Sequence, residues 1–570
     1  MAKRAARRKH QKQKQPKTFN TESTGIGRPF MFVVLGGLLL AGIITRVYYL
    51  DRSLWLDEAW VANSIQSASL REAIYYDDWL QTTPPLFIAL SRLITALFGT
   101  SNVAFRALPA FAGIVSILLF AFIALRLLKP SYALSAILLF VLSPRLILYS
   151  QSLKQYSTDV LSTLGLMAIG VNYMEKPTDR SFYVLTAGFV ALSFLSYPVM
   201  LFLPFLLHAA FTRVDLPPGM GATQRTIRFS GLRLLVVIVA GLFVGATNYW
   251  FFIQPNRSPT LTGFFPEGFY QGSDLNKFLE FYGTRFLTLA GPLFFGGHSA
   301  WRIVAAVLIV IGLVYLWTSQ LTSRGIKGSG TAILLTVPLA GAIALNLIGF
   351  FPLPGFDHRL LLFVFPTTVL AFALGLECFV NLLARLIASQ VKNFKTAAVE
   401  NITGSVGFMA LVALVLLFFN SVGLEPYFAE EQEDSEQAVS YLTQRVQSND
   451  VVYIHASMRE QFKLYNRAMP VTASSTIYGK IGMPCCPRKD YRSPSQETVT
   501  DIAGEIFALV EASIGRSLWL LITDRPLHWF HIRRNDIQIF ERGLARQSCE
   551  KMDEAKFTGV YVARFGCKPK

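Results

Sequence analysis

Long apolar stretches constrain this chain more than any other feature of its sequence. Thirteen of them lie between residues 29 and 420, and about 20 apolar residues are enough for one helix to cross a bilayer. Charged residues make up only 16% of the chain, against about 25% in a typical soluble domain. A bilayer explains this deficit, because an ionised side chain in hydrocarbon is costly. The sequence therefore predicts a polytopic α-helical membrane protein.

Two of the apolar stretches, 84–98 and 286–297, are short for a full crossing and contain or begin at prolines. Short interrupted segments are often re-entrant or interfacial. If neither crosses, five loops that carry Lys or Arg fall on the same side as the basic N-terminus, as the positive-inside rule requires. We therefore expect eleven transmembrane helices, with thirteen as the alternative, an N-terminus in the cytoplasm and a C-terminus outside.

The N-terminal tail, residues 1–28, holds nine Lys or Arg and one acid, Glu22. This pattern predicts a cytoplasmic tail that orients the first helix. The basic stretch from Lys3 to Lys17 contains no Phe, Tyr or Trp, which argues against nucleic acid as a partner. The transmembrane region is expected to follow over 29–423, and its first outer loop over 51–83.

The last region, 424–570, has a different character, with charged and apolar residues mixed. Helices are predicted at 430–445 and 458–465, and strands at 450–455 and 517–522. Their alternation predicts a small extracytoplasmic α/β domain. Its four cysteines suit an oxidising compartment, and their spacing is wrong for a zinc site. We predict a Cys549–Cys567 disulfide, although the vicinal Cys485 and Cys486 compete as partners.

Two adjacent carboxylates, Asp57 and Glu58, lie among aliphatic and aromatic residues just beyond the first apolar stretch. Apolar neighbours would partly desolvate an acid and make it a better base. The alternative is an interfacial helix that begins here, because acids are favourable in a first helical turn.

Further polar groups accumulate at the predicted outer face. The candidates are Asp78 in the first loop, Gln151, Lys154 and Tyr156 between two helices, and His358 and Arg359 before a long apolar helix. Each group has a structural alternative. The loop acid would be solvated, the second group would form an interfacial Tyr/Lys belt, and the arginine would snorkel rather than bind a phosphate with its planar guanidinium.

The order of these motifs resembles a known family. An acidic pair follows the first helix, then come Pro-Pro-Leu-Phe at 84–87, Ser-Pro…Tyr-Ser-Gln…Tyr over 143–156, and Arg-Leu-Leu-Leu-Phe…Pro from 359. Over about 29–420 the chain resembles the GT-C glycosyltransferases, in the branch of protein O-mannosyltransferases and lipid A aminoarabinose transferases. The resemblance implies a sugar donor on a polyprenyl phosphate, used at the outer membrane face.

The resemblance also implies that Asp57 is a catalytic base. Many relatives carry a basic residue or His before Pro-Pro, where this chain has Thr83. Many also have Glu and then Ala-Arg after Ser-Gln, where this chain has Ser152, Leu153 and Lys154. A donor-phosphate contact at Thr83 is therefore not expected, and Lys154 would supply the missing cation.

We therefore predict an inverting glycosyltransferase of the cell envelope, in the inner or plasma membrane. Its donor is a polyprenyl-phosphate sugar, and its acceptor is a lipid, glycan or protein. No residue cluster requires a cofactor; if a divalent metal binds, Asp57 and Glu58 are the expected ligands. The site residues are predicted as Asp57 and Glu58 for catalysis, Arg359, Lys154 and Tyr156 for the donor phosphate, and Gln151, Asp78 and His358 for further substrate contacts.

Two other functions remain open at this point. A transporter or flippase of lipid-linked sugars would place polar groups deep within its spans, whereas the ionisable residues here lie mainly at helix ends. A sensor or assembly subunit would use the α/β domain and need the membrane part only as an anchor. Eleven crossings are more than an anchor requires.

Overall fold

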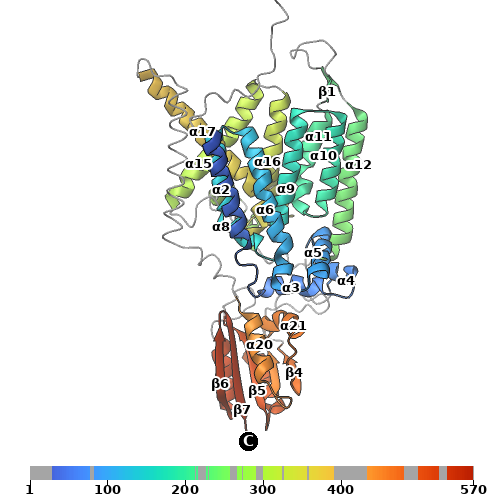
Figure 1. Ribbon diagram of the computed structural model, residues 1–570, viewed down its shortest axis with the longest axis vertical. Coiled ribbons are helices and arrows are strands. Elements are labelled where there is room, and N and C mark those ends of the chain that lie inside the picture. The colour runs from blue at the N-terminus through green and yellow to red at the C-terminus, as the bar shows by residue number, and fades with distance from the viewer. Residues whose placement is uncertain are drawn as a thin grey trace, which may run out of the picture.

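The protein consists of a helical bundle and a C-terminal sheet domain attached to one end of it (Figure 1). This computed structural model describes residues 28–76, 82–211, 213–215, 226–228, 230–256, 266–272, 274–289, 299–323, 326–355, 358–390, 433–479, 499–524 and 536–568.

Apolar helices build the bundle, as the sequence predicts. Their packed interior is made of aliphatic and aromatic side chains, and many outward-facing side chains are also large and apolar. The elements are α2 (Arg28–Val47), α6 (Asn102–Leu127), α7 (Pro130–Val141), α8 (Pro144–Ser150), α9 (Tyr156–Glu175), α10 (Asp179–Ser193), η1 (Tyr197–Phe202), α11 (Leu203–Phe211), α12 (Gly231–Thr247), η2 (Asn248–Ile253), α14 (Leu275–Leu287), α15 (Ser299–Ser323), α16 (Ile326–Leu347), η6 (Arg359–Val364) and α17 (Phe365–Gln390).

Among the described residues, four helices are long and apolar enough to cross a membrane by themselves. The pair α7 and α8 is bent by 50° and makes a fifth if it is one span. Pro144, at the start of α8, accounts for the break, because proline cannot donate the helical hydrogen bond. The prediction of a polytopic helical membrane protein is confirmed; the count of eleven crossings stays a prediction.

Three short helices lie at the end of the bundle nearest the sheet domain (Figure 1). They are α3 (Leu56–Ile65), α4 (Leu70–Ile74) and α5 (Pro85–Phe98). With 14 residues, α5 is about 21 Å long and does not reach across a hydrocarbon core of about 30 Å. This agrees with the prediction for 84–98.

The other end of the bundle carries the hairpin of β1 (Arg213–Asp215) and β2 (Thr226–Arg228), away from the sheet domain (Figure 1). The hairpin contains arginines of one predicted cytoplasmic loop. α3, the helix that carries Asp57 and Glu58, lies at the opposite end of the bundle from this hairpin (Figure 1).

The C-terminal domain holds a five-stranded sheet of order β4-β3-β5-β7-β6. Its strands are β3 (Val451–Ile454), β4 (Ser475–Tyr478), β5 (Ser517–Thr523), β6 (Cys549–Phe557) and β7 (Val560–Cys567). The first three in sheet order are parallel, β7 pairs antiparallel with β5, and β6 pairs antiparallel with β7. Both predicted strands are confirmed as β3 and β5.

Helices cover both faces of this sheet. α20 (Ser435–Arg445) and α21 (Arg459–Asn466) bury apolar side chains on one face, together with Trp519. α22 (Val499–Ala512) and α23 (Asp536–Arg546) pack on the other. The apolar cluster of the first face continues into α3 and α5, so the domain shares a core with the first outer loop.

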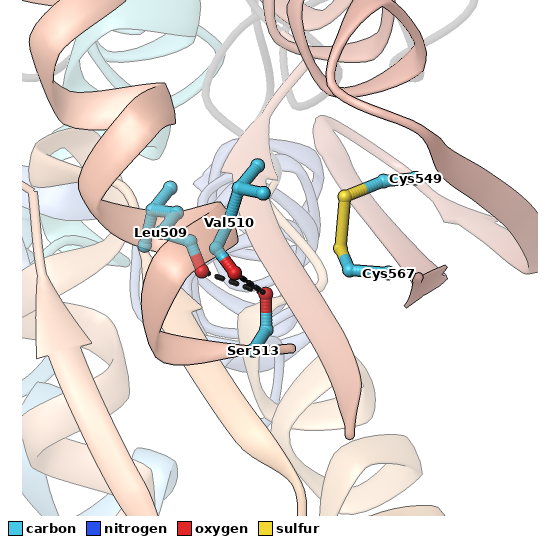
Figure 2. The surroundings of a disulfide bond; sticks show 5 residues. All are labelled: Leu509, Val510, Ser513, Cys549 and Cys567. Carbon is cyan, nitrogen blue, oxygen red and sulfur yellow. Dashed lines mark hydrogen bonds between the residues drawn. A yellow bond between two sulfur atoms is a disulfide. The ribbon is translucent and has the colours of Figure 1, made fainter. Parts of the chain in front are cut away.

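The predicted disulfide between Cys549 and Cys567 is present, with an S–S distance of 2.07 Å (Figure 2). The two cysteines face each other across β6 and β7. Nearby, the Ser513 hydroxyl donates to the Leu509 and Val510 carbonyls and closes the end of α22 (Figure 2). Cys485 and Cys486 lie outside the described residues.

Candidate active site

Asp57 is the one residue of α3 whose side chain is not buried. Its Oδ2 lies 3.2 Å from an Arg359 guanidinium nitrogen and 3.8 Å from the Lys154 Nζ. The three side chains are 16%, 18% and 14% exposed in that order. The fold thus brings together three predicted site residues from separate segments, in a place that solvent and a ligand can still reach.

Glu58, the neighbouring acid, is fully buried and forms an ion pair with Arg106 of α6. The Arg106 guanidinium donates to both carboxylate oxygens, at 2.9 and 2.6 Å. The backbone N–H of Leu153 donates to Glu58 Oε1 at 2.6 Å, and that of Trp55 donates to Oε2 at 3.4 Å. Glu58 therefore joins the start of α3 to α6 and to the segment that carries Lys154.

The electrostatics of Glu58 follow from these contacts. Burial opposes its ionised form and is the largest single effect on its pKa. The charges of Arg106 and Arg52 and the hydrogen bonds from Arg106 and Leu153 together outweigh burial and hold the pKa below 4.5. Glu58 is consequently an anion in the folded protein at neutral pH.

The other predicted site residues have mixed positions. Tyr156 begins α9, is buried, and packs edge-to-face on Tyr149 at 5.1 Å between ring centroids. Gln151 is buried, and its amide donates to the Thr45 carbonyl at 2.5 Å. His358 caps η6, where its Nδ1 accepts from the Leu360 N–H at 3.3 Å. Asp78 lies outside the described residues.

Three arginines near the site were not predicted. Arg106 is fully buried, and besides Glu58 it donates to the carbonyls of Leu50, Arg52 and Ser53. Its place within an apolar stretch was the available signal, because a buried arginine needs a partner. Arg52 donates to the Gln151 carbonyl at 3.4 Å. Arg145 is exposed and, like Arg359, lies within electrostatic range of His358.

The C-terminal domain holds the start of α3 in place. The Tyr465 hydroxyl of α21 accepts from the Leu54 N–H at 2.6 Å and donates to Asn102 Oδ1 at 3.1 Å. Glu433 Oε2 accepts from the Leu56 N–H at 3.2 Å. The first amides of a helix have no partner within it, so two side chains of the C-terminal domain satisfy groups directly before Asp57.

A metal ion between Asp57 and Glu58 is poorly supported by their surroundings. Both oxygens of Glu58 already accept hydrogen bonds, and Asp57 faces two cations. Divalent cations prefer several oxygen ligands free of competing positive charge. Within the described ranges, no group of three His, Cys, Asp or Glu side chains is arranged to hold a metal.

Comparison with known proteins relates one segment of this chain to a described family. Residues 82–243 match the family model described as dolichyl-phosphate-mannose-protein mannosyltransferase. No curated protein matches by sequence. Among solved structures the chain is similar to ArnT from Cupriavidus metallidurans bound to undecaprenyl phosphate, with 13% identity and a TM-score of 0.48, covering 94% of this chain and 98% of that one.

It is also similar to the Archaeoglobus fulgidus oligosaccharyltransferase tethered with an acceptor peptide, with 11% identity and a TM-score of 0.45, covering 94% of this chain and 74% of that one. The segment that matches the family model contains Lys154 and Tyr156 as well as the Pro-Pro motif. This match points to a glycosyltransferase, as predicted. Residues 82–243 thus resemble the dolichyl-phosphate-mannose-protein mannosyltransferases, the kind of enzyme that the order of the motifs predicted.

Proposed function

We propose that this protein moves a sugar from a polyprenyl-phosphate donor to an acceptor, with inversion at the anomeric carbon and Asp57 as general base. The observation that carries the proposal is the cluster of Asp57, Lys154 and Arg359. It pairs a partly exposed carboxylate with two cations at the end of the bundle where the C-terminal domain sits (Figure 1). A base and a phosphate site lie side by side there.

The two cations suit the leaving group. A guanidinium binds two phosphate oxygens with its planar fork, and an ammonium adds a compact charge. Both are within 4 Å of Asp57, so a bound phosphate competes with the carboxylate for them. Binding of the donor lipid would therefore draw Arg359 and Lys154 toward the phosphate and leave Asp57 available to accept a proton.

In the transfer step the acceptor hydroxyl or amine attacks the anomeric carbon and gives its proton to Asp57. The bond between that carbon and the phosphate oxygen breaks, and its electron pair leaves with the polyprenyl phosphate. The carboxylate has the role of the base in inverting glycosidases. Arg359 and Lys154 stabilise the charge that develops on the phosphate.

Glu58 has a positioning role in this scheme. Its buried contacts to Arg106 and to the Leu153 N–H fix α3 relative to the segment that ends at Lys154. Side chains held by such contacts keep a site near its productive geometry. Tyr156, Gln151 and His358 stay proposed contacts of the substrates, and so does Asp78, which lies outside the described residues.

We further propose that the site faces the extracytoplasmic side of the inner or plasma membrane, with the N-terminus in the cytoplasm. The basic tail and the positions of the arginine-containing hairpin and of α3 at opposite ends of the bundle support this orientation (Figure 1). Single Lys154→Cys or Arg359→Cys variants test it in cells. Labelling by an impermeant thiol reagent from outside is expected, and labelling only after permeabilisation would reverse the orientation.

The activity is tested with purified protein and a polyprenyl-phosphate sugar, by following release of polyprenyl phosphate. Asp57→Asn is expected to lower turnover by about 10²–10⁴-fold, as loss of a general base does. Glu72→Gln is the matched control, because Glu72 is an exposed acid of the same loop. Near-normal turnover by Asp57→Asn would remove it from the mechanism. A product with retained anomeric configuration would contradict inversion.

A further inference from the structure

A groove of about 590 Å³ runs between the loop before α3 and the C-terminal domain. The loop contributes Asp51, Arg52 and Ser53, and the domain contributes residues of α20 and β6 and Met469, which follows α21. Ligand sites in proteins commonly have volumes of about 300–1,000 Å³ and often lie at domain interfaces. The groove has the size and place of a binding site, and the proposed chemistry does not use it.

Hydrogen-bonding side chains dominate the lining of the groove. Gln437 and Gln444 are exposed on α20, and Ser440 lies between them. A primary amide offers two donors and two acceptor lone pairs, and a hydroxyl offers both functions. Such a surface matches a ligand whose own groups both donate and accept, which is the property of sugar hydroxyls.

Two aromatic rings belong to the same lining. Tyr441 and Phe557 pack edge-to-face with 5.8 Å between their ring centroids, and Met469 lies beside them in the groove. Both aromatic side chains are only partly buried. Partly exposed aromatic rings next to polar groups suit a ligand with one apolar and one polar side, as a pyranose ring has.

The charge of the groove selects against anions. Three carboxylates line it, those of Asp51, Asp434 and Glu436, against the single cation Arg52. The Arg52 guanidinium is engaged by the Gln151 carbonyl and by the charge of Glu58. A phosphate or carboxylate in the groove would meet like charge, whereas a neutral or amino sugar would not.

The groove is joined to the proposed active site through the backbone. Residues 51–53 lie directly before α3, the helix that carries Asp57. The Ser53 hydroxyl accepts from the Glu436 N–H at 3.3 Å, which holds α20 against this loop. An acceptor held here therefore contacts the loop that leads into α3, the helix that carries Asp57.

We infer that this groove binds the acceptor, and that the acceptor is a glycan with neutral or amino sugars rather than a phosphorylated or acidic one. This rests on the proposed glycosyl transfer and specifies its acceptor class. The variant Gln437→Lys places a long cationic side chain in the groove. Gln538→Lys is its matched control, because Gln538 is an exposed glutamine of α23 on the other face of the sheet.

The test measures binding to the full-length protein in detergent by saturation-transfer NMR, without donor lipid. The probes are maltotriose, a glucosamine trisaccharide and a galacturonic acid trisaccharide. We expect the neutral and amino sugars to bind, the acidic one to bind at least about tenfold more weakly, and Gln437→Lys to weaken the two binders by a similar factor. Gln538→Lys should match the wild type.

Each other result overturns the inference. Binding unchanged by Gln437→Lys would place the sugar elsewhere, and preferred binding of the acidic probe would contradict the charge argument. If the protein binds none of the probes but still releases polyprenyl phosphate, the groove is not the acceptor site, while the proposed sugar transfer is unaffected. Groove-dependent sugar binding by protein that never uses a polyprenyl-phosphate sugar would refute the transfer and with it the acceptor role.

Discussion

The buried pair of Glu58 and Arg106 allows a quantitative prediction about stability. Both side chains are fully buried, and their closest contact is 2.6 Å. Glu58→Gln keeps the size of the side chain but leaves the Arg106 charge buried without an opposite charge. Breaking a buried pair by removing one partner typically costs about 3–5 kcal/mol. We expect Glu58→Gln to lower the free energy of unfolding by about this amount.

The assay is unfolding of the detergent-solubilised protein, followed by intrinsic fluorescence at neutral pH. Glu72→Gln serves again as the control, and an exposed change of this kind should stay within about 0.5 kcal/mol of the wild type. Arg106→Met should be at least as damaging, because the carbonyls of Leu50 and Ser53 also lose their donor. The double variant Glu58→Gln/Arg106→Met should lose less free energy of unfolding than the two single variants lose together.

The pH dependence of this effect has a definite sign. The pKa of Glu58 is lowered on folding from 4.5, so its ionised form stabilises the protein above pH 4.5, and this contribution is lost as pH falls through the folded-state pKa. The difference in the free energy of unfolding between wild type and Glu58→Gln should be largest at neutral pH and should decrease in acid. A difference in the free energy of unfolding below about 0.5 kcal/mol at pH 7, or one that increases in acid, would refute the reasoning.

Three further outcomes follow from the contacts around the site. Arg359→Ala should raise the KM for the donor lipid more than Lys154→Ala does, because the fork binds two phosphate oxygens; the reverse order would contradict the donor assignment. Tyr465→Phe leaves the buried Leu54 N–H unpaired, and should lower the free energy of unfolding by about 1–3 kcal/mol and lower kcat. Unchanged kcat and stability would argue against a role of Tyr465 in holding the start of α3. Cys549→Ser should destabilise the C-terminal domain by about 3 kcal/mol, and non-reducing peptide mapping should recover Cys549 linked to Cys567; free thiols in natively made protein would exclude the pairing.

The sequence alone determined the class of this protein and part of its C-terminal domain, namely the strands β3 and β5 and the helices α20 and α21. Apolar stretches of 20 residues have few alternatives to a membrane helix, because backbone groups in lipid must bond within the segment. The strands β3 and β5 were predictable for a similar reason, whereas the Cys549–Cys567 disulfide was only one of the pairings that the cysteine positions allowed. Local apolar runs, turns and cysteine positions are properties of short segments, and they need no knowledge of distant contacts.

Only the tertiary structure shows that Asp57 and Glu58 have different surroundings. They are adjacent and chemically alike, but successive side chains on a helix point about 100° apart. One therefore meets Arg106 in the buried interior, and the other meets Lys154 and Arg359 at a partly open surface. These partners come from other segments far along the chain, so no local pattern could show which acid is available to a substrate.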